Sequence, residues 1–250
     1  MENTFINLTE ENLGKEHLCC IIRTKTVHPG VEAKRKWLAQ RLSEGHVFRK
    51  LDVKGCVFIE YAPAETAWVP INADNYLYIY CLWVNGEYKG KGYGRQLMEY
   101  CINDAKKQGK SGICMLAADK QKAWLSDQSF AESFGFRTVD TATGGYRLLA
   151  LSFDNAPARF TDTARRGIIK DKELHIYYDD QCPFIDYYIS YTRKYCQSNG
   201  VPVHFHHVDT LKKAKDLPGV FNNWCVFCNG HMQTVNLLNE SSLKQILKQK

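Results

Sequence analysis

A chain of 250 residues with 44% hydrophobic and 24% charged residues has the composition of an ordinary folded protein, which excludes disordered, collagen-like and fibrous chains. No apolar run approaches the roughly 20 residues that cross a bilayer, and the first ten residues carry no leader pattern, so we expect a cytoplasmic protein without a membrane partner. The formal charge of +6 is too small and too dispersed to indicate nucleic-acid binding, and it suits an anionic small ligand equally well.

The first part of the chain alternates β-rich and helical patterns. Apolar spacing and glycine stops predict helices at 31–44 and 94–107 and a third that ends near Phe134. Strands are predicted at 46–53, 56–71, 76–84, 111–117, 136–141 and 146–153. This pattern is typical of an α/β (α+β) fold in which helices flank a mixed sheet.

A change of pattern divides the chain in two. Residues 154–171 are polar and aperiodic, and a new strand begins at Glu173. We therefore predict a first domain at 1–153, a linker at 154–171 and a second domain at 172–250.

A glycine-rich turn lies between the predicted strand that ends at Val84 and the helix that carries Leu97 and Met98. Its sequence, residues 89–95, is Lys-Gly-Lys-Gly-Tyr-Gly-Arg. Closely spaced glycines allow backbone amides to converge, and the start of the following helix adds unsatisfied N–H groups with a partial positive charge. The turn therefore predicts a pyrophosphate cradle. The spacing does not fit a P-loop, which needs Gly-Lys before Ser or Thr, nor a dinucleotide fingerprint, which should open its domain.

Two motifs in order resemble the GNAT N-acetyltransferase superfamily over residues 4–153. Residues 89–94 resemble its acyl-CoA loop, and Phe130-Ala-Glu-Ser-Phe-Gly-Phe136 resembles the end of its next helix. The resemblance implies that acetyl-CoA binds as cosubstrate where two parallel strands splay apart. It implies these binding residues: Trp83 and Val84 for the pantetheine arm, and Lys89, Gly90, Lys91, Gly92, Tyr93, Gly94 and Arg95 for the pyrophosphate.

Acetyl transfer to an amine needs a proton acceptor and a group that reprotonates the thiolate. Ala131 stands where the family often has a Tyr for the second task, so that assignment fails here. Glu60 and Tyr78 are the candidate bases. Glu60 lies on an apolar strand, where burial would raise its pKa, although a solvent-facing position is the alternative.

Two further observations concern the acceptor site. Tyr76, Tyr78 and Tyr80 share one strand face, so they either line the acceptor pocket or pack beneath it. Ser126 and Asp127 either reach this pocket or cap a helix, and we favour the cap.

The second part of the chain predicts a small α/β domain. Strands at 174–178, 201–208, 224–228 and 232–238 combine with a helix from about 185 that stops at Gly200, an Asn229-Gly230 hairpin turn and a closing helix from Ser241. This order resembles a thioredoxin-like fold, and residues 227–247 resemble the YoaP-like domain of some bacterial GNAT proteins.

The ten cysteines are scattered, and we expect them to be mostly reduced and buried. Cys182 occupies the position of the first thioredoxin thiol, but the second is absent, so dithiol exchange is not expected. Cys225, Cys228 and His231, with His204 and His206, form a possible metal set. We expect no metal there, because strand residues three apart face opposite sides and no second pair completes the set. His207 is expected at the surface.

The sequence therefore favours an N-acetyltransferase that moves an acetyl group from acetyl-CoA to a primary amine by direct attack in a ternary complex. The acceptor is a small molecule or a protein, and the second domain is expected to shape its site. The alternative is a non-catalytic acyl-CoA-binding module whose second domain binds a protein or a metal. A thiol-redox protein is a third hypothesis, and the oligomeric state stays open.

Overall fold

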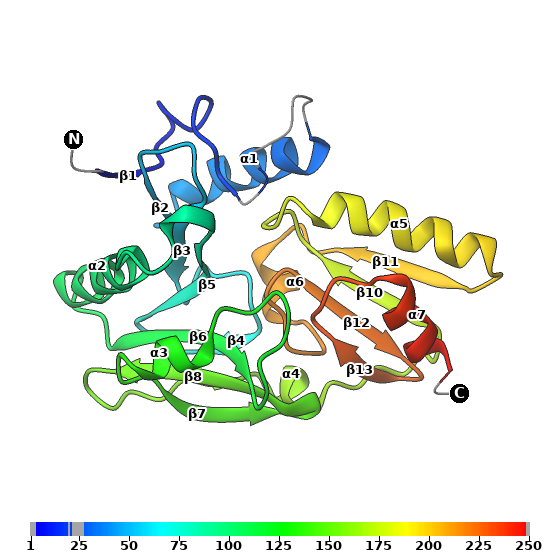
Figure 1. Cartoon of the computed structure of the whole chain (residues 1–250). Coiled ribbons are helices and arrows are strands. Elements are labelled where there is room, and N and C mark those ends of the chain that lie inside the picture. The colour runs from blue at the N-terminus through cyan, green and yellow to red at the C-terminus, as the bar shows by residue number, and fades with distance from the viewer. Residues whose placement is uncertain (1–3, 20, 22–27, 249–250) are drawn as a thin grey trace.

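The computed structural model describes residues 4–19, 21 and 28–248 and contains a large and a small sheet side by side (Figure 1). The large sheet has seven strands in the order β1-β2-β3-β5-β6-β8-β7, in which only the β5–β6 pair is parallel. Its strands are β1 (Phe5–Asn7), β2 (Val47–Leu51), β3 (Val57–Pro63), β5 (Tyr76–Val84), β6 (Gly112–Ala118), β7 (Arg137–Ala142) and β8 (Tyr146–Ser152). The mixed sheet predicted from the sequence is confirmed.

Helices cover both faces of this sheet. Helix α1 (Pro29–Leu42) buries Trp37 in the core on one face, while α2 (Tyr93–Lys107) buries Leu97 in the core on the other, together with the short α3 (Gln128–Glu132). Strand β5 lies between the two cores. Tyr76, Tyr78 and Tyr80 share one face of this strand, as predicted, and that face packs in the core on the α1 side.

The parallel strands separate partway along their length. Tyr76 to Ile79 of β5 pair with Gly112 to Met115 of β6, and the rest of β5 pairs with β3 alone. A β-bulge lies at the same point, where Glu60 and Tyr61 are adjacent but pair with Cys81 and Ile79. The bulge puts Tyr80 and Cys81 on the same side of the strand, although they are neighbours in sequence. The large sheet therefore opens beside a bulge.

The small sheet has the order β11-β10-β12-β13, with β10 and β11 parallel. Its elements are β10 (Leu174–Tyr178), α5 (Ile185–Ser198), β11 (Val203–His207), α6 (Leu211–Lys215), β12 (Trp224–Cys228), β13 (His231–Thr234) and α7 (Glu240–Leu247). The predicted strands, long helix and closing helix are present, although the strand expected at 232–238 is the shorter β13 and ends at Thr234. The turn is confirmed, since Asn229 and Gly230 both have positive φ. The thioredoxin-like resemblance stays a prediction.

The two halves share one hydrophobic core. Helices α5 and α7 cover one face of the small sheet, while residues of its other face, such as Phe227, belong to the same buried cluster as Tyr78 and Leu148 of the large sheet. Helix α1 also packs against α5, and Gly30 allows the approach, because a Cβ there would lie 1.9 Å from the carbonyl oxygen of Pro183. The contact between the halves is therefore close.

Some elements were not expected from the sequence. The predicted strand at 56–71 is β3 followed by turns and the two-residue β4 (Ile71–Asn72). Residues 154–171 contain β9 (Arg159–Phe160), which pairs with β4, and α4 (Asp162–Arg166), and they are therefore ordered. The division into domains stays a prediction.

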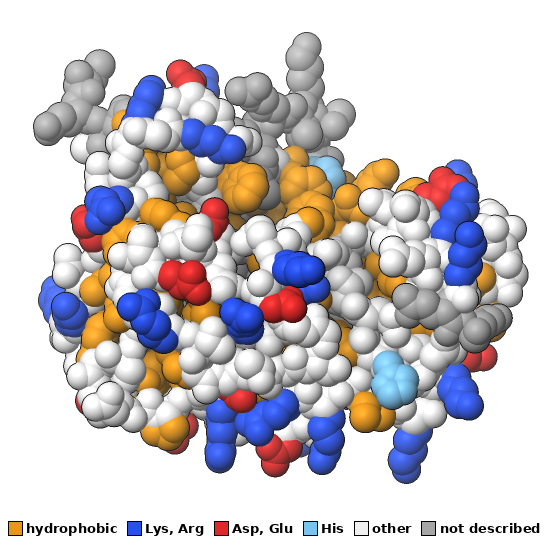
Figure 2. All heavy atoms as spheres, turned by 60° about the horizontal axis from the view of Figure 1, so that its bottom comes forward, with side chains coloured by type: hydrophobic (Ala, Val, Ile, Leu, Met, Phe, Trp, Pro, Cys, Tyr) orange, Lys and Arg blue, Asp and Glu red, His pale blue; other side chains and the backbone are white. Residues whose placement is uncertain are grey.

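The surface carries no obvious single-sign stripe on the face drawn in Figure 2, where Lys and Arg side chains are interspersed with Asp and Glu. Within the described ranges, no helix is both long and apolar enough to span a membrane.

Candidate active site

A cavity of about 630 Å³ lies where β5 and β6 separate, and we call it the loop cavity. Its walls come from the end of β5, the glycine turn, the start of α2 and α3. The structure brings together in this wall most of the residues expected to bind the cosubstrate: Trp83, Val84, Lys89, Gly90, Gly92, Tyr93, Gly94 and Arg95. Lys91 is the exception, since its ammonium lies over the ring of Tyr88 instead.

The backbone of the glycine turn explains its composition. Gly90 and Gly92 have φ values of 74° and 80°, in the left-handed region that other residues rarely adopt. Gly92 is the N-cap residue of α2 and has no side chain that could accept a hydrogen bond. The first backbone N–H groups of the helix are therefore not capped by a side chain. An uncapped helix N-terminus in a cavity wall is suited to an anion.

A second cavity, of about 640 Å³, lies between the two halves of the chain, and we call it the junction cavity. The first half contributes Glu60 and several aromatic side chains, and the second half contributes six residues: Gln181, Cys182, Pro183, Phe184, Asn222 and Asn223. The expectation that the second half shapes a pocket beside the first therefore agrees with this arrangement.

The two cavities adjoin. Trp83 and Ser126 line both of them, and the backbone N–H of Leu82 donates to the Ser126 hydroxyl at 3.2 Å. The cap expected nearby is confirmed for Asp127, whose carboxylate accepts from the backbone N–H of Phe130 at the start of α3. Ser126 instead lies where the loop cavity meets the junction cavity.

One wall of the junction cavity is held in an unusual conformation. Trp124 has φ of 69°, which is uncommon for a bulky residue, and 41% of its surface is exposed. Its ring lies edge-on to Phe184 and Tyr188 of the second half, with centroid separations of 5.3 Å and 5.9 Å. Aromatic contacts across the two halves therefore stabilise the strained turn.

A buried ionic network also contributes to the lining of the junction cavity. The Lys34 ammonium donates to Glu60 Oε2 at 2.6 Å and to the backbone oxygen of Gln181 at 2.8 Å. The Gln181 side-chain amide donates to the same Glu60 oxygen at 2.8 Å, and His46 Nε2 donates to Glu60 Oε1 at 3.0 Å. The side chain of Glu60 has no exposed surface. Both carboxylate oxygens are therefore satisfied, and the network joins the two halves.

The ionisation expected for Glu60 was wrong. Burial raises the pKa of its carboxyl, but the Lys34 ammonium and the hydrogen bond from His46 outweigh burial and hold the pKa below its ordinary value. Burial lowers the pKa of His46, so the imidazole is neutral near pH 7. Glu60 is neither an unpaired buried acid nor a solvent-facing residue. It is a carboxylate with three polar neighbours.

The structure places Tyr78 apart from both cavity linings. Its hydroxyl is buried and donates to Asn222 Oδ1 at 2.8 Å, while Asn222 Nδ2 donates to the backbone oxygen of Tyr80. Burial raises the pKa of Tyr78 well above its ordinary value, so it does not serve as a base near pH 7. Its position supports an indirect effect through Asn222, which does line the junction cavity.

Sequence reasoning missed Lys34, His46 and Gln181, which lie 26, 14 and 121 residues from Glu60 along the chain. A single Lys in a helix that also carries Lys36, Arg35 and Arg41 gives no signal of burial. Other expectations hold: Ala131 is buried in the loop-cavity wall without a hydroxyl, and Cys182 is half-buried just before α5.

The possible metal set of two cysteines and His231 is not assembled. Cys225 faces the shared core, Cys228 faces the core beneath α5 and α7, and His231 is exposed. His207 is at the surface as expected, paired with Asp180.

Comparison with known proteins agrees with this geometry. The model of the acetyltransferase (GNAT) family matches residues 19–136, and the YoaP-like model matches residues 202–245. The chain is 36% identical over 246 residues to a Bacillus subtilis (strain 168) protein described as uncharacterized N-acetyltransferase YoaP, which covers 97% of this chain and 98% of the relative.

Solved structures show more distant likeness. The ribosomal-protein-S18-alanine N-acetyltransferase from Escherichia coli is 18% identical with a TM-score of 0.41, covering 62% of this chain and 96% of the other. The paia N-acetyltransferase from Thermoplasma acidophilum, crystallised with coenzyme A, is 16% identical with a TM-score of 0.43, covering 61% and 100%.

The chain is a GNAT-fold acyltransferase. It belongs, with YoaP, to the GNAT family members that carry a YoaP-like C-terminal region, and it is an acetyl-CoA-dependent N-acetyltransferase.

Proposed function

We propose that acetyl-CoA occupies the loop cavity, that the acceptor amine occupies the junction cavity, and that direct attack takes place where they adjoin. The observation that carries this proposal is the shared wall of Trp83 and Ser126. Holding a thioester and an amine against each other removes much of the entropic cost of a bimolecular reaction.

In this arrangement the chain holds the cosubstrate mainly by its backbone. The segment of β5 that β6 leaves unpaired, which includes Trp83 and Val84, bonds to the pantetheine arm. Amides of residues 90–95 hold the pyrophosphate at the N-terminus of α2. Lys89, Lys91 and Arg95 add positive charge for the remaining phosphate; Arg95 is 64% exposed, so its contribution is screened by solvent.

The junction cavity favours a primary amine attached to an apolar or aromatic body. Phe58, Tyr80, Trp124 and Phe184 give it aromatic walls, and the charged side chains among its described lining are Glu60, Lys34 and Lys122. Aromatic faces bind both apolar surface and an ammonium group. A small molecule and an exposed protein amine both have this chemistry.

The transfer requires the amine nitrogen to lose a proton, attack the thioester carbonyl carbon and expel the CoA thiolate. Both Glu60 oxygens are hydrogen-bonded within the protein and the pKa of its carboxyl is lowered, so we assign the amine proton to solvent in the cavity rather than to Glu60, which acts as a positioning residue for Lys34 and Gln181. The Ser126 hydroxyl accepts from Leu82, so its own O–H can donate a hydrogen bond to the departing thiolate. The proton lost by the amine passes through solvent to this thiolate, which leaves as neutral CoA while Ser126 keeps its proton. Tyr78 acts as a positioning residue that orients Asn222.

A cytoplasmic location and the absence of nucleic-acid and membrane partners stay predictions from the sequence.

The test compares two aromatic substitutions at the start of α5. Phe184 lines the junction cavity, whereas Tyr187, at 55% exposure, lines neither cavity. CoA release from acetyl-CoA is measured against a panel of primary alkyl and aryl amines, and the best acceptor is then titrated. Phe184→Ala should raise the acceptor KM by about tenfold, equivalent to about 1.4 kcal/mol, with unchanged acetyl-CoA affinity. Tyr187→Ala should change neither quantity.

Equal acceptor KM values for Phe184→Ala and the unsubstituted chain would place the acceptor elsewhere. A loss of acetyl-CoA affinity in Phe184→Ala would contradict the separation of the two cavities.

A further inference from the structure

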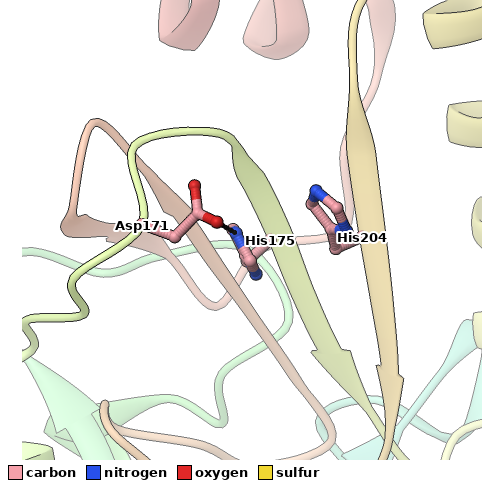
Figure 3. Close-up of side chains that lie close together, drawn as sticks. All are labelled: Asp171, His175 and His204. Carbon is pink, nitrogen blue, oxygen red and sulfur yellow. Dashed lines mark ion pairs between the residues drawn. The ribbon is translucent and has the colours of Figure 1, made fainter.

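Histidines and acidic side chains gather on the small sheet, away from both cavities. Asp171, His175 and His204 each offer one ligand atom, and these atoms all lie within 4.8 Å of one another. Figure 3 shows Asp171 beside His175, with His204 on the neighbouring strand. We propose that these three residues bind a divalent transition-metal ion, zinc in the first place.

The fold places the three residues together. His175 of β10 and His204 of β11 are directly paired in the parallel ladder, so their side chains project from the same face of the sheet. Asp171 lies in the turn before β10, where its Oδ1 accepts the backbone N–H of Glu173 at 2.8 Å. The turn therefore holds its carboxylate beside the two rings.

His175 has a buried nitrogen that makes no hydrogen bond with the protein. Its side chain is 10% exposed, and its Nε2 has no hydrogen-bond partner within the part of the chain that the structure describes. This nitrogen forms a long ion pair with Asp171 Oδ2, at 3.4 Å, which Figure 3 marks with a dashed line. A buried imidazole nitrogen without a hydrogen bond costs free energy, and a bound cation between it and Asp171 would remove that cost.

The other ring nitrogen of His175 is already oriented. Its Nδ1 lies 2.9 Å from His206 Nε2, and the two rings are stacked within 6° of parallel. A histidine ligand in proteins is typically fixed by a hydrogen bond at its second nitrogen. The His206 contact leaves Nε2 as the ligand atom of His175.

The remaining ligands have room to adjust. The side chains of Asp171 and His204 are 51% and 46% exposed, so each can turn toward a common point near His175. Glu173 Oε2 lies 2.5 Å from His204 Nε2, so this carboxylate can orient the His204 ring or supply a fourth ligand.

The donor set selects the ion. Imidazole nitrogens with a carboxylate suit zinc and its neighbours, at ligand distances of about 2.0–2.2 Å, whereas magnesium and calcium prefer oxygen alone. The bound ion would join the turn before β10 to the edge strand β11, and so stabilise the small sheet. This site is independent of acetyl transfer.

Calorimetry on the full chain, stripped with a chelator, tests the proposal with zinc and cobalt(II) as probes. We expect one equivalent to bind and to raise the melting temperature. His204→Ala and Asp171→Asn should each weaken binding by about tenfold or more. Because both positions are half-exposed, these variants should fold, and their acetyl-CoA affinity should be unchanged.

The control is His207→Ala on the same strand. His207 is 41% exposed like His204, but it pairs with Asp180 and projects from the opposite face. It should leave metal binding unchanged. The cobalt(II) spectrum should lack a thiolate charge-transfer band, which separates this site from the cysteines.

Three results would overturn the proposal: no binding at micromolar zinc, equal affinity in His204→Ala and the unsubstituted chain, or a thiolate band on cobalt(II) binding.

Discussion

Removing the negative charge of Glu60 should cost the protein a large part of its stability. In Glu60→Gln the Lys34 ammonium, 2% exposed, stays buried without its counter-charge. Breaking a buried ion pair at one partner typically costs about 3–5 kcal/mol. Because domains are stable by about 5–15 kcal/mol, this single change should remove about a fifth or more of the free energy of unfolding.

Replacing both partners of the ion pair together should restore most of the lost stability. In the double variant Lys34→Met, Glu60→Gln no unpaired ion remains, so its stability should return to within about 2 kcal/mol of the unsubstituted chain. The exposed i,i+4 pair of Lys212 and Asp216 provides the control. Asp216→Asn should cost less than about 0.5 kcal/mol.

Urea unfolding followed by tryptophan fluorescence measures the free energy of unfolding of the unsubstituted chain, the double variant, Asp216→Asn and both single variants, Glu60→Gln and Lys34→Met. The reasoning is refuted if Glu60→Gln costs less than about 1 kcal/mol, or if the double variant is as unstable as the sum of its single changes. Either result would mean that the network is not held as an ion pair.

Three other predictions concern the cavities and the contact between the halves. Gly92→Val forces a branched side chain into the left-handed region at the cradle, so calorimetry should show CoA binding weakened by tenfold or more. Gly109 also has a positive φ, of 65°, but lines neither cavity, so Gly109→Val should leave CoA binding unchanged. The pKa values of His46 and Glu60 are both lower in the fold than in the unfolded chain, so each group takes up a proton more readily when the chain unfolds. The free energy of unfolding should therefore decrease as the pH drops below about 6.5, through His46, and decrease further below about 4.3, through Glu60. A constant free energy of unfolding from pH 8 to 4 would contradict this. Gly30→Ala should lower the melting temperature, since its Cβ would lie 1.9 Å from an oxygen of Pro183, whereas Gly14→Ala, with open space around it, serves as the unaffected comparison.

The sequence predicted the elements with strong local signals. Strand β5 and strand β10 begin and end where their apolar patterns do, and the glycine turn lies between strand and helix as its spacing indicates. The strands that the sequence did not predict are short. Strands β4 and β9 have two residues each, which is too few to form a periodic pattern.

The candidate site likewise has a part that the sequence predicted and a part that it did not. Backbone features such as the turn of residues 89–95 follow from local sequence, because glycine placement controls them. The network of Lys34, Glu60 and Gln181 depends on packing between residues far apart in the chain, which local patterns do not encode.

The shared core means that the second half cannot be removed without affecting the first, which the predicted linker did not suggest. Phe227 and Tyr78 lie in one buried cluster, so deleting residues 171–250 would expose apolar surface of the first half. Point substitutions in the junction cavity are therefore better tests of the second half than truncation.

Binding of acetyl-CoA in the loop cavity is tested most directly by hydrogen–deuterium exchange of the full chain with and without CoA. CoA should slow exchange at the backbone amides of residues 82–84 and 90–95 and leave the small sheet unchanged. Unchanged exchange in both of those segments, with protection elsewhere at saturating CoA, would contradict the placement of the cosubstrate in the loop cavity.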